Sequence, residues 1–336
     1  MKKKVILSYD YELFFGDCSG TVQKSLIEPT NNIMDAMEDV GFRGNFFIDV
    51  LMIRYLRQNC DERSRNDLKL IEDQIRDIVR RGHRIELHLH PHWVDAKYNG
   101  DGTWNFSDFH HYSLSSFNEI EIISMFDEGT KYLNAIGSEI IPNYKVCAFR
   151  AGGWAVQPFN KIRKAFILAG LKIDSSSAKG IYVRNQNSSY DFRNLPPKDL
   201  FNFDVDVCME DQNGTFIEIP ITTYHRSFCC SVVHKVTQYI RKGYNKRLTD
   251  GTHVRSSEAP NIRPFSKLYN LFHSDVVLYM LSFSQSNPFT LKKIIKNSSS
   301  TLFCFIDHPK DFSLATCDGI KGISGLCESV LYNEIG

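Results

Sequence analysis

The densest group of histidines in the chain lies between residues 83 and 92, where four of its eleven histidines occur. Neutral imidazole is a common zinc ligand, and a catalytic zinc usually binds three protein ligands and keeps one position open. His88 and His92 have the H-x-x-x-H spacing, which lets two imidazoles converge on one metal where a strand ends and the chain turns. The segment therefore predicts two ligands of a divalent metal, zinc before others, and requires a third.

Two other interpretations of this segment remain open. His90 competes with His92 for the second ligand position, because residues two apart lie on the same side of a strand. Short motifs also occur by chance, and a histidine-rich strand end at the surface, with its imidazoles in ordinary hydrogen bonds, would show the same pattern.

Apolar runs typical of strands alternate with helical patterns along the chain. The expected strands are 5–9, 45–50, 84–89, 145–149, 171–174, 216–222 and 301–306, and the expected helices are 31–40, 66–81, 116–134 and 157–169. Asn66 is the expected N-cap of the second helix, and Ser116 forms a capping box with Glu119 in the third. This alternation predicts an α/β fold with a parallel sheet, either closed as a barrel or open and doubly wound.

Polar residues follow five of these apolar runs, where parallel α/β folds gather their catalytic groups. They are Asp10, His88, Arg150, Asp174 and His308. The three tryptophans, Trp93, Trp104 and Trp154, lie in segments that follow these strand ends. Aromatic faces in a cleft suit stacking on sugar rings, although buried packing is the commoner role of tryptophan.

Five segments of the chain, in order, resemble the motifs of the polysaccharide deacetylases, the NodB-homology group of carbohydrate esterases. They are Asp10-Tyr11-Glu12, Gly82-His83-x-Ile85-x-x-His88-x-x-x-His92, Phe149-Arg150-Ala151-Gly152-Gly153-Trp154, Ile173-Asp174-Ser175-Ser176 and Phe305-Ile306-Asp307-His308-Pro309. The resemblance covers residues 4–176 and 301–311. It implies a distorted (β/α)7 barrel and metal-dependent hydrolysis of an N-acyl or O-acyl group on a sugar.

The first motif departs from the family pattern of two adjacent aspartates, since Tyr11 follows Asp10. Glu12 offers the second carboxylate, and relatives with an acid two positions on use that acid. On a strand, Asp10 and Glu12 share a side, which makes joint action at one metal feasible. The resemblance then implies Glu12, His88 and His92 as metal ligands, with Asp10 as the rival of Glu12.

The resemblance also implies roles for the other strand-end residues. Asp10 would take the proton of a water activated by the metal, and His308 would give a proton to the departing group. Arg150 would keep Asp10 ionised, and Asp174 would orient His308. Tyr11, Trp93 and Trp154 are the expected substrate contacts. Ordinary buried ion pairs are the alternative for Arg150 and Asp174.

Charge divides the chain into two parts. Residues 222–299 hold twelve Lys and Arg against three Asp and Glu, a net +9 in a chain of net +1. We expect this stretch to be a basic, helical insertion packed on a barrel made of residues 1–221 and 300–336. Its patches, Arg241, Lys242, Lys246, Arg247 and Lys292, Lys293, Lys296, suit a phosphate-linked carrier or an anionic membrane surface. No nucleic-acid-binding signature accompanies the charge.

The sequence thus predicts a cytoplasmic, metal-dependent deacetylase that acts on an acylated sugar, such as a precursor of a surface glycan. The N-terminal apolar run is too short for a signal peptide, and nine scattered cysteines suit reduced thiols. Two alternatives are a hydrolase of the same fold that opens a cyclic amide or imide, and a non-catalytic glycan-binding barrel.

Overall fold

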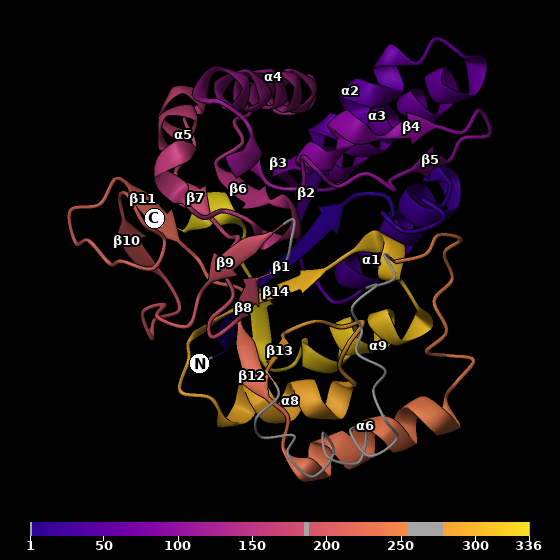
Figure 1. Cartoon of the computed structure of the whole chain (residues 1–336). Helices are drawn as coiled ribbons and strands as arrows, with labels where there is room; N and C mark the ends of the chain where they lie inside the picture. Colours follow the sequence, from indigo (N-terminus) through magenta and orange to yellow (C-terminus); the bar gives the residue numbers. More distant parts are fainter. Residues whose placement is uncertain (1, 185–187, 254–277, 336) are drawn as a thin grey trace.

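The computed structural model describes residues 2–184, 188–253 and 278–335. Within these ranges, seven parallel strands form one sheet in the order β11-β7-β6-β3-β2-β1-β14 (Figure 1). They are β1 (Lys3–Tyr11), β2 (Asn45–Asp49), β3 (Arg84–Leu89), β6 (Ala148–Ala151), β7 (Ile173–Asp174), β11 (Phe216–Glu218) and β14 (Leu302–Asp307). β10 (Phe201–Phe203) pairs antiparallel with β11, and β15 (Cys327–Ser329) pairs with β1.

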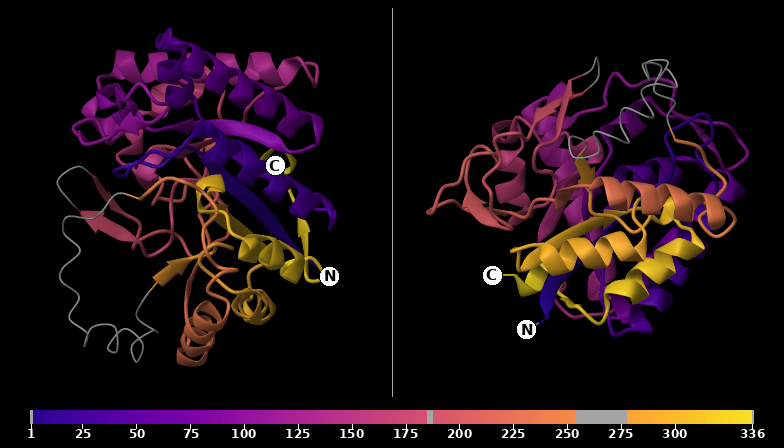
Figure 2. Two further views of the ribbon diagram at one scale, coloured as in Figure 1. Left: turned by 90° about the vertical axis from the view of Figure 1, so that its right-hand side faces the viewer. Right: turned by 90° about the horizontal axis from the view of Figure 1, so that it is seen from below.

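Helices flank this sheet on its outer side (Figures 1 and 2). They are α1 (Glu28–Glu38), α2 (Val50–Gln58), α3 (Glu62–Arg80), α4 (Glu119–Ser138), α5 (Arg163–Ala169), α6 (Phe228–Ile240), α8 (Pro288–Asn297) and α9 (Leu314–Ile323). Three short antiparallel pairs complete the described strands: β4 (Lys97–Tyr98) with β5 (Trp104–Asn105), β8 (Tyr182–Arg184) with β9 (Ser189–Asp191), and β12 (Thr223–His225) with β13 (Leu278–Met280).

The two predicted N-terminal helix caps differ from those in the structure. α3 starts at Glu62, because the Asp61 side chain accepts a hydrogen bond from the Ser64 amide at 3.1 Å, so Asn66 lies inside the helix. α4 starts at Glu119, with Asn118 and Glu121 forming the capping box that was expected of Ser116 and Glu119. In both cases another residue of comparable capping preference lies within five positions of the expected one.

The sheet is curled until its two ends share one core. Side chains from β1, β2, β6, β7 and β14 meet in a single buried cluster: Ile6, Phe47, Ala148, Ile173, Ile219, Leu302, Cys304 and Tyr332. Four strands, β6, β3, β2 and β1, separate β7 from β14 in the strand order, yet Ile173 and Leu302 belong to this one cluster. Successive residues of a strand face opposite sides. The residues in this cluster therefore mark the inner side of the barrel.

The seam between β11 and β14 is closed by residues outside the regular strands. The Thr222 amide donates to the Cys304 carbonyl at 3.0 Å, and the Cys304 amide donates back to Thr222 Oγ1 at 2.9 Å. Further along, Leu281 bridges the Thr222 carbonyl and the Ile306 amide. The predicted distorted seven-stranded barrel is therefore confirmed, and the open, doubly wound alternative is excluded.

The basic stretch 222–299 contains helices where the structure describes it. α6 and α8 lie in it, and Phe283 donates its amide to Asp307 of β14 at 2.6 Å. Residues 254–277 lie outside the described residues, and the division into barrel and insertion stays a prediction. Among the helices that the structure describes, none has the length and apolar character to cross a bilayer.

Candidate metal centre and active site

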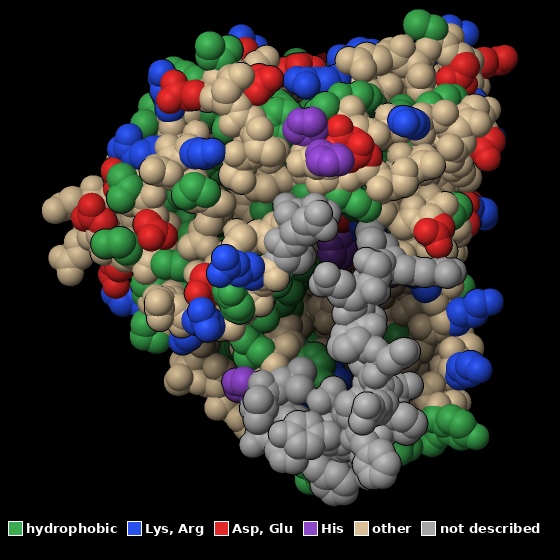
Figure 3. Space-filling model, in the orientation of Figure 1, with side chains coloured by type: hydrophobic (Ala, Val, Ile, Leu, Met, Phe, Trp, Pro, Cys, Tyr) green, Lys and Arg blue, Asp and Glu red, His purple; other side chains and the backbone are tan. Residues whose placement is uncertain are grey.

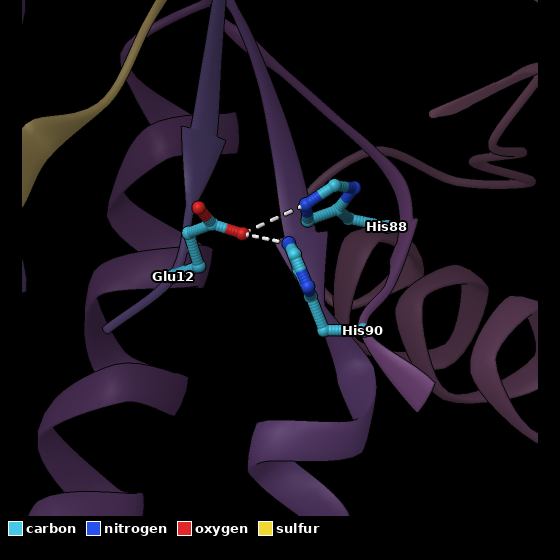
Figure 4. Close-up of side chains that lie close together, drawn as sticks. All are labelled: Glu12, His88 and His90. Atoms are coloured by element: carbon cyan, nitrogen blue, oxygen red, sulfur yellow. Dashed lines mark hydrogen bonds and ion pairs between the residues drawn. The ribbon is translucent and has the colours of Figure 1, made fainter. Parts of the chain in front are cut away.

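Glu12, His88 and His90 converge at the carboxyl ends of β1 and β3 (Figure 4). One ligand atom from each of the three lies within 4.8 Å of the others, and all three residues are buried. His88 Nε2 donates to Glu12 Oε2 at 2.9 Å, and His90 Nε2 is paired with the same oxygen. Because Glu12 is two residues beyond Asp10, and His90 two beyond His88, alternation puts all four on the inner side.

A hydrogen bond from Nδ1 to the backbone fixes the orientation of the His88 ring. Its Nδ1–H donates to the Arg150 carbonyl at 2.7 Å, which leaves Nε2 as the atom that faces Glu12. Burial would lower the pKa of His88, but the carboxylates of Asp10 and Glu12 outweigh it and raise this pKa to about 9. The proton on Nε2 is thus held by carboxylates that would equally hold a metal ion in its place.

The structure brings His90, rather than the predicted His92, to Glu12. Pro91 starts a 3-10 turn, Pro91–Asp95, and this turn carries His92 behind His90, where the two Nδ1 atoms are 3.3 Å apart. The His92 ring is buried against Phe15 and Tyr112, and its Nε2 has no partner among the residues described. His92 is placed to orient His90, since a ligand histidine usually bonds a neighbour through its second nitrogen.

Asp10 and Arg150 form a buried ion pair beside this group. Arg150 Nη1 donates to Asp10 Oδ1 at 2.7 Å, and the other guanidinium nitrogens donate to Ser8 Oγ at 2.9 Å and to the Ser175 carbonyl at 2.8 Å. Burial would raise the pKa of Asp10, but Arg150, followed by His88 and His308, lowers it below its usual value. Asp10 is therefore held as a carboxylate.

His308 reaches both carboxylates from β14. Its Nε2 lies 3.7 Å from Asp10 Oδ2 and 3.6 Å from Glu12 Oε1. The side chain is 21% exposed, so it is the member of the site that meets solvent. Figure 3 shows a hollow on this face of the molecule, with histidine colour at its floor. The predicted acid and the predicted base thus lie side by side.

Asp174 lies apart from His308. In β7 the neighbouring residue Ile173 belongs to the inner cluster, so Asp174 faces the outer side, where it accepts from Ser176 Oγ at 2.7 Å. It lies opposite Glu218 in the β7–β11 pairing. The carboxylate nearest to His308 Nδ1 is instead Asp311, at 3.5 Å. The orienting role predicted for Asp174 therefore has a better placed candidate in Asp311.

Two of the three predicted substrate contacts are packing residues. Tyr11 faces the outer side of β1, where its hydroxyl donates to Gln74 Oε1 of α3 at 2.8 Å. Trp93 is fully buried, and its Nε1 donates to Asp49 Oδ2 at 2.6 Å. Trp154 follows β6 and is only partly buried. It is the one of the three that a ligand could contact without rearrangement.

Sequence reasoning missed Lys310, Asp49 and the importance of Gly152. Lys310 is buried, and its Nζ donates to Glu12 Oε1 at 2.6 Å and to the Leu13 carbonyl at 3.0 Å. Its position two residues after His308 was the available signal. Asp49 ends β2 and accepts from the His90 amide at 3.3 Å. A Cβ on Gly152 would come within 2.6 Å of His90 Nδ1, so only glycine leaves room for this imidazole.

The three converging residues fit a divalent metal. A carboxylate and two imidazoles are a common donor set of catalytic zinc, and all three residues are buried with their ligand atoms close together. Burial would raise the pKa of Glu12, but His90 and Lys310 lower it well below its usual value, so this carboxyl group is ionised. Lys310 binds Oε1 and the histidines face Oε2, which leaves one carboxylate oxygen directed at the metal position.

No protein-family model matches the chain, and no curated protein matches it. Among solved structures it is similar to a 4-alpha-glucanotransferase from Thermococcus litoralis, at 11% identity and a TM-score of 0.47; the match covers 99% of this chain and 40% of that one. It is also similar to a family 4 carbohydrate esterase from Streptomyces lividans in complex with acetate, at 10% identity and a TM-score of 0.41; this match covers 99% of this chain and 95% of that one. A polysaccharide deacetylase from Bacillus cereus is similar at 9% identity and a TM-score of 0.41, over 100% of this chain and 95% of that one. Identities this low leave the function to be argued from the side chains of the site.

Proposed function

We propose that the protein is a metal-dependent hydrolase that removes an N-acyl or O-acyl group from a sugar. One observation carries the proposal: Glu12, His88 and His90 converge at the barrel mouth next to the ionised Asp10 and the partly exposed His308. A metal site, a base and an acid within a few ångströms are the parts that hydrolysis of an acyl group needs. The order of the five sequence motifs supports the sugar as the substrate class.

Glu12, His88 and His90 would hold the metal. A divalent ion there, zinc before others, supplies a Lewis acid that polarises the acyl carbonyl and favours ionisation of water. His92 would fix the His90 ring through the contact between their Nδ1 atoms, and Lys310 would fix Glu12.

Asp10 would accept the proton of the attacking water. Its Oδ1 is bound to Arg150, while Oδ2 faces His308 and is the oxygen available to the water. Arg150 holds the carboxylate in place through a guanidinium that is itself bound to Ser8 and Ser175. The base is therefore both ionised and immobile before substrate arrives.

His308 would give a proton to the departing amine or hydroxyl group. Its Nε2 stands at the open side of the two carboxylates, and its Nδ1 lies 3.5 Å from Asp311 Oδ2. The same carboxylate also accepts from His253 Nε2 at 2.6 Å. Asp311 would thus hold the His308 ring in the orientation that presents Nε2 to the leaving group.

Aromatic and amide side chains near the metal position could receive the sugar. A pocket beside it is lined by Phe15, Asn99, Asn105, Phe106 and Phe109. Phe15 also contacts the rings of His90 and His92, with centroids 4.4 and 4.2 Å apart. Amide groups and exposed ring faces are the groups that commonly bind sugars. Trp154 would contribute a further face.

The test combines metal content with acetate release from N-acetylated oligosaccharides. Purified protein is expected to hold about one divalent ion per chain, by the three-ligand rule for catalytic zinc. The double variant His88→Ala, His90→Ala should lose both metal and activity. His110→Ala, which removes an exposed histidine, is the matched control and should keep both.

Asp10→Asn and His308→Gln should keep the metal and lose about 10²- to 10⁴-fold in kcat. Full metal content in the double variant, or unchanged activity after chelation, would overturn the proposal. Ring opening of a cyclic amide with no acetate release would assign the site to that other reaction, and metal-free binding of glycan would assign it to a binding module.

A further inference from the structure

We propose that the exposed face of α6 docks on an anionic lipid surface. This inference stands on residues outside the proposed active site and does not need the proposed activity. α6 lies at the outer edge of the molecule, next to α8, and Figure 2 shows the two helices side by side when the molecule is seen from below.

Large apolar side chains concentrate on α6. Its exposed members include Val233, Val236, Tyr239 and Ile240, which are 37%, 49%, 86% and 74% exposed. Elsewhere among the described residues, exposed large hydrophobic side chains are spread singly or in pairs over many elements. A soluble surface rarely gathers several such side chains on one helix without a use for them.

The helical spacing puts part of this group on one stripe. Cys229, Val233, Val236 and Ile240 follow one another at intervals of four, three and four, so they share a face that points away from the buried Ser231. The stripe is about 20 Å long for a helix of this length. It is long enough to lie in a membrane interface and too short to cross one.

Exposed basic side chains lie on α6, just after it and on the neighbouring α8. Lys235, Lys242 and Lys246 are exposed on α6 and the segment after it, and Lys292, Lys293 and Lys296 are exposed on α8. None of the six has an ion-pair partner within the described residues, whereas many other surface lysines and arginines do. The other two predicted members of the basic patch are engaged: Arg241 pairs with Asp318, and Arg247 lies near Asp311.

The combination of apolar stripe and unpaired lysines favours lipid over a second copy of this chain. Two copies joined through α6 would bring the two sets of lysines together, and like charges across an interface oppose association. An anionic surface attracts them instead, with each lysine near the surface adding measurably to binding, and the apolar stripe enters the boundary between headgroups and acyl chains.

The experiment uses the full chain and two kinds of vesicle, phosphatidylcholine alone and phosphatidylcholine with one third phosphatidylglycerol, in a sedimentation assay. Binding to the anionic vesicles is expected to be at least about tenfold tighter and to weaken with added salt. The triple variant Lys235→Gln, Lys242→Gln, Lys246→Gln should weaken it about 100-fold. The variant Tyr239→Ser, Ile240→Ser should weaken it about tenfold or more.

Matched controls change the same residue types elsewhere. Lys69→Gln, Lys145→Gln, Lys172→Gln removes three exposed lysines far from α6, and Ile120→Ser removes an exposed isoleucine of α4. Both should bind as the unchanged protein does, and circular dichroism checks that all variants are folded. Activity on a small soluble acetylated sugar should be equal in every variant.

Equal binding to both vesicle types, or binding that the α6 variants leave unchanged, would overturn the inference. So would a dimer, detected by light scattering, that Tyr239→Ser, Ile240→Ser converts to monomer, because it would assign the stripe to a second copy. Failure of the deacetylase assay leaves these outcomes as they are, since vesicle binding needs no turnover.

Discussion

Two pairs of buried acids lie at strand ends of this barrel and hold protons in opposite ways. Asp10 and Glu12 face the inner side of β1, while Asp174 and Glu218 face the outer side of β7 and β11. Burial alone would raise every one of the four pKa values. The pKa values of the inner pair are nevertheless lowered, that of Asp10 by Arg150 and that of Glu12 by His90 and Lys310. The pKa values of the outer pair are raised.

The difference lies in the counter-charges and not in the depth of burial. Arg150 and Lys310 are themselves buried and each is bound to one inner carboxylate. The outer pair has hydroxyl groups as partners, with Ser176 on Asp174 and Ser177 on Glu218 at 2.5 Å. Burial raises the pKa of both outer carboxyls; Asp174 raises that of Glu218 further, whereas the hydrogen bond from Glu218 only partly offsets the effect of burial on Asp174. The inner acids can therefore bind a cation or take a proton, while the outer acids share a proton and join two strands.

Removing Arg150, the cation bound to Asp10, should cause the largest loss of stability. Arg150→Met leaves the Asp10 charge buried and unpaired, and such a loss typically costs about 3–5 kcal/mol of unfolding free energy. Urea denaturation at pH 7 measures it. The double variant Arg150→Met, Asp10→Asn is the control and should recover most of the loss; equal destabilisation of both variants would show that packing on Phe47, and not charge, is what Arg150 supplies.

Displacing an imidazole of the inner group should come next. Gly152→Ala places a Cβ against the His90 ring, and we expect metal affinity to fall about 10- to 100-fold, as it does when the support of a ligand is disturbed. Competition with a fluorescent chelator measures the affinity. Gly325→Ala has open space around its Cβ and should bind metal normally. Unchanged affinity in Gly152→Ala would mean that His90 is not a ligand.

Neutralising the outer pair should change how stability depends on pH. Because the folded pKa of Glu218 is raised, its protonated form stabilises the fold below the unfolded value of about 4.3, and this stability is lost as pH rises through the folded pKa. Glu218→Gln removes that loss, so the variant should gain stability relative to the unchanged protein between pH 5 and about 8. Urea titrations across this range are the measurement, and parallel curves for both proteins would contradict the shared proton.

The smallest change in stability is expected for Tyr11→Phe, which compares the outer face of β1 with the inner face that carries Glu12. Tyr11→Phe removes the hydrogen bond to Gln74 on the outer side, and we expect a loss of about 0.5–1.5 kcal/mol of stability with unchanged metal content and kcat. Glu12, the next residue, faces inward and should be indispensable for metal. A tenfold fall in kcat for Tyr11→Phe would restore the substrate role predicted for it.

The sequence was sufficient to predict the barrel and most of its inner residues. Asp10, Glu12, His88, Arg150 and His308 all lie on the inner side, because strand alternation in long runs is readable from sequence. β7 comprises two residues in the structure, too few to reveal which of Ile173 and Asp174 faces inward. The choice between His90 and His92 depends on the turn that Pro91 starts. Lys310 lies in a turn with no periodicity to place it.

Trp93 is buried for a different reason. Trp93 is covered by Trp104 and Phe106, with ring centroids 5.0 and 4.8 Å away, which come from the short β4–β5 pair and the segment after it. The residues next to Trp93 in the sequence give no indication that these rings cover it. Burial of a side chain at a strand end depends on what packs over it, and that is a property of the whole fold.

Residues 302–332 complete the barrel wall beside β1. β14 and β15 both pair with β1, and Tyr332 enters the inner cluster, where its hydroxyl donates to Ser175 Oγ at 2.7 Å and accepts from Arg150 at 3.4 Å. β1 leaves the ribosome long before these partners. Contacts so distant along the chain close late and slowly. In a nascent chain, β1 therefore stays unpaired on one side until β14 and β15 have been synthesised. Comparing the refolding rates of the chain with and without residues 326–336 would show how much these residues contribute to the rate of folding. Synthesis that stops early leaves the Asp10–Arg150 pair open to water, so an incomplete chain carries no finished site.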